Sequence, residues 1–193
     1  MICGGHGAVR STFFRLEVHM ATNAPLVLRA SQTAANNVIP LQSRAPERLV
    51  GVGFRCWLTG FTTGEIGSWE EAWNTFSSTL GNDHAKLLLL DLSQFVRAVS
   101  ATSERNIRVQ APGCSGFCRD ECLAISMIAA CQHNARDALR ASTTALIGSD
   151  DIGDALTGAQ KFAGGLRSVN QILSAESVCP ATCALRVGKS RLM

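Results

Sequence analysis

The sequence predicts an all-α protein: a single-domain bundle of about five or six helices with a poorly structured N-terminal lead-in. Three observations support this class. Apolar residues recur at helical spacing in several segments, and Gly or Pro residues separate those segments. The composition, 46% hydrophobic and 17% charged, is typical of a globular protein. The 193 residues suffice for one domain with a sizeable core.

The N-terminal segment 1–46 is predicted to be poorly ordered. It is rich in Ala, Asn, Ser and Gln from residue 20 onward, and three prolines prevent any long helix: Pro25, Pro40 and Pro46. One short helix over residues 31–38 is compatible with this composition. The periodicity that predicts packed helices begins only after this segment.

Residues 1–19 show no clear periodicity, whereas Met20 opens a more ordinary beginning. Two interpretations stay open: Met20 is the true initiator, or residues 1–19 form a disordered tail of the native protein. In either case Cys3 and His6 are not candidate site residues.

The helical domain is predicted to span residues 47–175. Its first segment carries large apolar residues at helical spacing, namely Phe54, Trp57, Leu58 and Phe61. Gly51 and Gly53 weaken a helix there and leave a strand possible. The next segment opens with Ser68-Trp-Glu-Glu71, which has the form of a capping box.

The helix that this box predicts carries Trp69, Trp73 and Phe76 on one face and ends at Gly81. An aromatic stripe of this kind either packs into the core or forms a groove for a partner, and its helical spacing favours the core. Asn82 or Asp83 can cap the third helix. Its apolar stripe is the clearest in the chain: Leu88, Leu92, Phe95, Val96 and Val99.

Residues 104–113 are predicted to be a connector that ends in a Pro-Gly turn. A buried helix over about 115–134 follows, and then a helix over 136–147. Asp150 or Asp151 can cap a last helix that reaches Ile172 or Leu173. Residues 176–193 form a C-terminal tail.

The cysteines Cys114, Cys118 and Cys122 are four residues apart, and on a helix this spacing places three thiols on one face. Their predicted neighbours on that face are Ile, Phe and Ala, so packing of reduced thiols in the core is the favoured explanation. The alternative is a metal or thiol-redox site, because thiolates prefer soft ions such as zinc or copper. Cys179 and Cys183 could complete such a site.

Other signals argue against several function classes. The net charge of +3 is small and the basic residues are scattered, so nucleic-acid binding is not favoured, although residues 136–173 resemble a loose helix-turn-helix arrangement. No phosphate-binding loop, nucleophile elbow or zinc-protease motif occurs. No apolar stretch approaches the roughly 20 residues of a membrane span, and no secretory signal precedes the domain.

We therefore expect a cytoplasmic protein, and the scarcity of Lys among its basic residues is typical of a bacterial one. The sequence favours a non-catalytic interaction or accessory protein that binds a protein partner and needs no cofactor. The alternative is a thiolate-based metal-binding or thiol-redox protein built on Cys114, Cys118 and Cys122. A DNA-linked regulator is the third hypothesis. Neither the partner nor the oligomeric state can be predicted.

Overall fold

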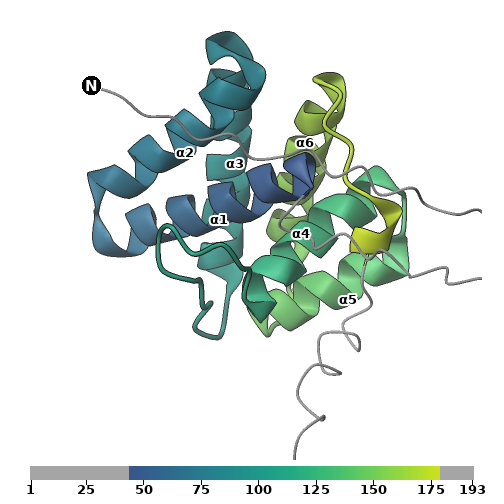
Figure 1. Ribbon diagram of the computed structural model, residues 1–193. Helices are drawn as coiled ribbons and strands as arrows, with labels where there is room; N and C mark the ends of the chain where they lie inside the picture. The colour runs from purple at the N-terminus through teal and green to yellow at the C-terminus, as the bar shows by residue number, and fades with distance from the viewer. Residues whose placement is uncertain (1–43, 179–193) are drawn as a thin grey trace, which may run out of the picture. The chain divides into compact units, whose positions relative to one another are not determined.

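The computed structural model describes residues 44–178, and within them the chain forms six α-helices, one short 3-10 helix and no strand (Figure 1). The predicted all-α class is therefore confirmed. The segments 1–43 and 179–193 lie outside the described residues, and with them Met20, Cys179 and Cys183. The elements are α1 (Ala45–Thr63), α2 (Ile66–Leu80), α3 (Asn82–Thr102), α4 (Arg119–Gln132), α5 (Arg136–Ile147), α6 (Gly153–Ser168) and η2 (Ala175–Ser177).

Each of the first three helices packs against the other two, and α3 also packs extensively on α6. Helix α4 contacts α1, α5 and α6, and so joins the N-terminal helices to the C-terminal ones (Figure 1). A column of aromatic rings runs through this core. The Phe95 ring lies 5.9 Å from that of Phe54 and 6.3 Å from that of Phe162, measured between centroids. Three helices are thus tied together by offset aromatic contacts.

Helix α4 is the most deeply buried element, as its sequence predicts. Residues 123–130 are all buried, and the only polar side chain among them, Ser126, shares a hydrogen bond with the Ser142 hydroxyl of α5. A helix that is apolar nearly all round belongs at the centre of a bundle. Its observed start at Arg119 lies four residues after the predicted start at residue 115.

Helix α1 contains Gly51 and Gly53 without interruption, so the helical alternative for this segment is correct. Both glycines lie where another helix or loop approaches closely. A Cβ atom at Gly53 would lie 2.8 Å from Cδ2 of Leu92 and 2.9 Å from Cε2 of Phe76. The helix propensity lost at glycine is therefore offset by close packing against α2 and α3.

The predicted stripes of α2 and α3 face the core. All five residues of the α3 stripe are buried, as are Phe76 and Ala72 of α2. Trp73 is half-buried against the core, and the Trp69 indole packs on Gly60 of α1. The aromatic stripe of α2 is therefore mainly a core element.

The predicted capping box at Ser68 is wrong. Helix α2 already begins at Ile66, and Ser68 is buried within it, where its Oγ has no hydrogen-bond partner in the described part of the chain. Only Gly64 and Glu65 separate α1 from α2, so the second helix must begin as soon as the chain has turned. Ser68 therefore lies within the first turn of α2 and cannot be its N-cap residue.

The side-chain caps predicted for the third and last helices are also absent. A single residue, Gly81, with φ of 79°, separates α2 from α3 and serves as the cap residue of both. Helix α6 begins at Gly153 with Ile152 in the cap position. The helix then ends at Ser168, and the chain leaves it through Asn170, whose φ of 59° is left-handed.

Candidate functional site

The three cysteines singled out by their spacing do not share a helical face. Cys114 is exposed in the connector 103–118, Cys118 is the cap residue that precedes α4, and only Cys122 lies within the helix. The predicted ladder is therefore wrong. Its spacing has structural meaning only where all three residues are helical.

The start of α4 explains this difference. The Glu121 carboxylate accepts a hydrogen bond of 2.7 Å from the backbone amide of Cys118, and the Cys118 side chain faces the Glu121 amide in return. This is a capping box with cysteine in the position usually held by Ser or Thr. The helix therefore starts at Arg119. The x-x-Glu spacing after Cys118 is the signal that sequence reasoning passed over.

Among residues 44–178 no disulfide joins two cysteines, and four of the five thiols are at least partly buried. Burial raises the pKa of Cys122 and of Cys131 to about 11, and burial together with the nearby Glu71 carboxylate raises the pKa of Cys56 to about 12. Because the thiolate is the nucleophile, these three thiols are poor nucleophiles at neutral pH. Within residues 44–178, no three His, Cys, Asp or Glu side chains are arranged to hold a metal ion.

A buried ion pair joins α1 to the first turn of α4. The Arg55 guanidinium donates to both carboxylate oxygens of Glu121, at 2.7 and 3.3 Å, and the two side chains are 1% and 0% exposed. Arg55 also donates to the carbonyl oxygens of Cys114 and Gly116, at 2.7 and 2.6 Å. Its guanidinium lies 5.4 Å from the centre of the Phe117 ring. The cation is thus fully committed to the connector and to α4.

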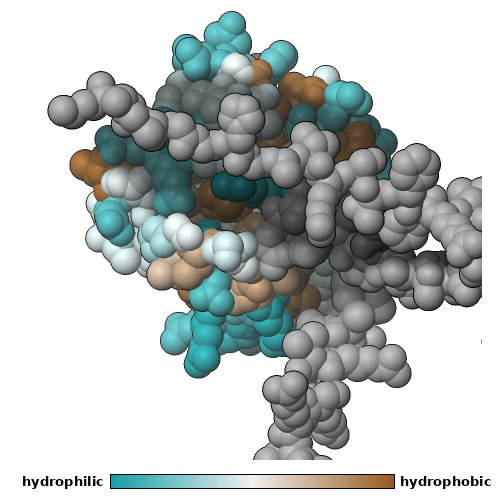
Figure 2. All heavy atoms as spheres, viewed as in Figure 1, coloured by the Kyte–Doolittle hydropathy of each residue, from teal (hydrophilic) through white to brown (hydrophobic). Residues whose placement is uncertain are grey.

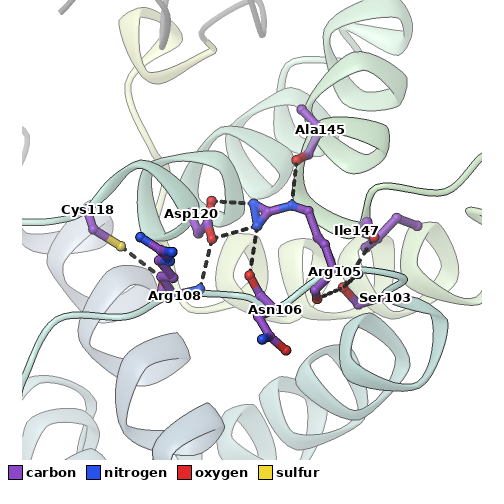
Figure 3. A network of polar contacts seen from close by, with 8 residues as sticks. All are labelled: Ser103, Arg105, Asn106, Arg108, Cys118, Asp120, Ala145 and Ile147. Atoms are coloured by element: carbon purple, nitrogen blue, oxygen red, sulfur yellow. Dashed lines mark hydrogen bonds and ion pairs between the residues drawn. The ribbon is translucent and has the colours of Figure 1, made fainter. Parts of the chain in front are cut away.

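The adjacent carboxylate, Asp120, holds the other end of the connector (Figure 3). It accepts from the Arg105 guanidinium through both of its oxygens, and from the backbone amide of Arg108 at 2.8 Å. Arg105 reaches on to the carbonyl oxygen of Ala145 in α5. The Cys118 thiol donates to the carbonyl oxygen of Arg108 at 3.0 Å. Figure 3 shows these groups converging at the start of α4.

The two neighbouring carboxylates therefore satisfy the backbone of a segment without secondary structure. The backbone amide of Gln110 also donates to the Glu121 carboxylate, at 3.1 Å. Buried polar groups need such partners, and charged acceptors make the stronger hydrogen bonds. The cluster positions the connector. Sequence reasoning missed it, although Arg55 stands out as a charged residue within an apolar helical face.

A second polar cluster ties the C-terminal segment to the bundle. The buried Glu47 carboxylate accepts from the amide of Ser174 and the hydroxyl of Ser177, at 2.8 and 2.7 Å. Gln132 binds the backbone of the same segment with both ends of its amide, and His133 Nε2 shares a 2.8 Å hydrogen bond with the Leu173 carbonyl oxygen. His133 is the cap residue that ends α4.

Among the hollows on the surface of residues 44–178, two bear on the function of the protein. The first, of about 440 Å³, lies between α1, α2 and the connector, and its lining includes Arg48, Glu71 and Cys114. Figure 1 shows the connector running beside α1 at this place. Of the three predicted thiols, only Cys114 lines it.

The second hollow, of about 350 Å³, is a groove between α3 and α6. Leu87 and Leu90 of α3 line it while remaining 65% and 57% exposed. Lys161 of α6 forms an ion pair with Asp91 of α3 at 3.1 Å in the same groove. Figure 2 shows that hydrophobic residues reach the described surface in several places, among hydrophilic ones.

Comparisons with known protein families, with characterised proteins and with solved structures find no match to this chain. Of the helices in residues 44–178, none combines the length and the apolar character that a membrane crossing requires.

Proposed function

We propose that this protein acts without catalysis, by binding an amphipathic helix of a partner protein in the groove between α3 and α6. The observation that carries this proposal is the exposure of Leu87 and Leu90. They lie three residues apart and therefore share one face of α3. Burying the exposed parts of both side chains would contribute on the order of 2 kcal/mol to binding.

The shape of the groove suits a helix. Gly165 brings α6 close to α3, since a Cβ atom there would lie 2.9 Å from Cδ2 of Leu88. Gly165 and Ser168 therefore leave a shallow floor beside the two exposed leucines. A partner helix with apolar residues at the first, fourth and eighth positions of its face would fill such a groove. The Asp91–Lys161 pair would provide a polar rim.

Photo-crosslinking tests the proposal. A crosslinking residue at position 90 is expected to capture one protein species in cells, and the variant Leu87→Glu, with the same crosslinker, should lose that species. The matched control places the crosslinker at Ile66, which is 67% exposed but outside the groove. Equal capture at both positions, or capture that survives Leu87→Glu, would contradict the proposal.

The thiolate-based alternative is favoured by one observation, the exposure of Cys114 at a cavity that also contains two arginines. Cys114, Cys118 and Cys122 would supply the thiols, with zinc or copper as the candidate ions, and binding would have to bring together thiols that residues 44–178 do not arrange as a metal site. Metal analysis of the full chain, purified under reducing conditions and accompanied by a free-thiol count, tests it. A stoichiometric ion that is lost in Cys114→Ser would support this alternative, and a metal-free protein with all thiols free would reject it.

A further inference from the structure

The cavity between α1, α2 and the connector is built from regularly spaced side chains on two helices. Helix α1 contributes Arg48, Val52 and Arg55, at positions i, i+4 and i+7, and α2 contributes Glu71 and Thr75, at i and i+4. The connector closes one side. A volume of about 440 Å³ lies within the range of small-molecule sites.

One wall of the cavity is apolar, and contacts with α1 and with the Arg55 guanidinium fix its position. The Phe117 ring packs so closely on α1 that a Cβ atom at Gly51 would lie 2.4 Å from its Cε1 atom. The Arg55 guanidinium covers the same ring at 5.4 Å. Phe117 and Val52 are both half-buried against the core. This wall is therefore preorganised for an apolar group of a ligand.

Two charges of opposite sign line the same cavity and are not neutralised there. Arg48 and Glu71 form no ion pair with each other, or with any other residue in the described part of the chain. Arg55 differs, because Glu121 and two carbonyl oxygens occupy its donors. Arg48 and Glu71 also line a neighbouring hollow along α1 and α2, so both side chains lie at an accessible junction.

We propose that this cavity binds a small zwitterion, an α-amino acid with an apolar side chain. Arg48 would pair with the carboxylate of the ligand, for which the planar guanidinium offers two parallel donors. Glu71 would pair with the ammonium group. The Thr75 hydroxyl donates to the Glu71 carbonyl oxygen, so its lone pairs remain to accept from that ammonium group. Val52 and Phe117 would contact the apolar side chain.

This site is separate from the α3–α6 groove, so the two proposals can fail independently. It predicts a ligand whose two charged ends are both required. A carboxylate alone would leave Glu71 unpaired, and an amine alone would leave Arg48 unpaired. Each loss removes one charge-assisted contact from a partly enclosed site.

Isothermal titration of the full chain tests the requirement directly. Leucine, methionine and phenylalanine are titrated first, followed by the amine and the carboxylic acid that correspond to the best of them. We expect saturable binding of at least one amino acid, with both single-charge analogues weaker by on the order of tenfold or more. No binding of any amino acid up to about 10 mM would overturn the proposal, as would equal binding of either analogue.

Variants locate the site. Arg48→Gln and Glu71→Gln are each expected to weaken binding of the amino acid by on the order of tenfold. Glu70→Gln is the matched control, because Glu70 is the neighbouring carboxylate on α2 but does not line this cavity. Thermal unfolding of each variant verifies its fold. Unchanged affinity in both folded cavity variants, or equal loss in the Glu70 control, would overturn the assignment.

Discussion

At the residue scale, Arg55 and Glu121 show how a charge pair can serve as a structural tie. They lie 66 positions apart in the sequence, and their side chains meet inside the core. Removal of both charges from water is costly, and their mutual attraction offsets it only when the remaining donors and acceptors also find partners. Here those partners are the backbone carbonyl and amide groups of the connector.

Loss of either member alone should therefore be strongly destabilising. We expect Arg55→Ala or Glu121→Ala to lower the free energy of unfolding by about 3–5 kcal/mol, because an unpaired charge stays buried. Urea unfolding measures this change. Arg97→Ala, at an exposed position of α3, is the control and should alter stability by less than about 0.5 kcal/mol.

The double variant Arg55→Ala/Glu121→Ala completes the cycle. It should cost less than the sum of the two alanine variants, since it leaves no unpaired charge in the core. Additive losses would show that the two side chains act separately.

The cysteines should differ in reactivity according to their surroundings. Cys114 is exposed, whereas Cys56 is fully buried with its pKa raised to about 12. Among the five cysteines of residues 44–178, we expect Cys114 to be alkylated first and Cys56 last at neutral pH. Timed labelling followed by peptide mass spectrometry gives the order. Fast labelling of Cys56 in the folded protein would contradict the described packing.

At the element scale, the prediction of helices from sequence succeeds where a pattern repeats over several turns. The stripe of α3 and the apolar α4 are examples, because burial of a whole face decides the secondary structure. Ends of helices depend on single contacts instead. Ser68 is a good cap in isolation, but a two-residue turn after α1 places it inside α2.

The candidate site was least predictable for the same reason. Cys114, Cys118 and Cys122 have helical spacing, but the capping box of Cys118 with Glu121 sets the start of α4, and the long-range ion pair of Glu121 with Arg55 reinforces it. Arg48 and Glu71 come together through the packing of α1 on α2. No local pattern in the sequence encodes the packing of α1 on α2.

Two glycines of α6 provide a matched test of helix packing. A Cβ atom at Gly158 would lie 2.9 Å from the Cα atom of Phe95 in α3, whereas nothing lies within 4 Å of one at Gly164. Gly158→Ala should therefore destabilise the protein by about 1–3 kcal/mol through overpacking. Gly164→Ala should stabilise it by about 0.5–1 kcal/mol through helix propensity. Thermal unfolding distinguishes the two, and changes of equal sign would contradict the α3–α6 contact.

At the scale of the whole molecule, thiols that are buried or partly buried make stability depend on pH in the alkaline range. Cys56, Cys122 and Cys131 have pKa values raised by burial to about 12, 11 and 11, from an ordinary value of 9.0. At pH values between the ordinary thiol pKa and these raised pKa values, the unfolded chain loses thiol protons that the folded chain keeps. The contribution to stability is thus complete below about pH 9 and declines toward pH 11–12.

We therefore expect the free energy of unfolding to fall steadily above about pH 9, with a slope of at most about 1.4 kcal/mol per pH unit for the fully buried Cys56. The chain contains no Tyr, so no phenol titrates in this range. Urea titrations at several pH values measure the slope, which should become shallower in Cys56→Ala. A stability that is constant from pH 8 to pH 11 would contradict this expectation.

The connector 103–118 also has a consequence for the order in which the molecule assembles. Its amides at Arg108, Gln110 and Cys118 bond to carboxylates of α4, and its carbonyl oxygens at Cys114 and Gly116 bond to α1. The bonds to Arg55 exist only after α1 and α4 have met, whereas the bonds to the α4 carboxylates do not need α1. We therefore expect the part of the connector around Cys114 and Gly116 to order last, and in amide hydrogen exchange to open before the helices that the connector links.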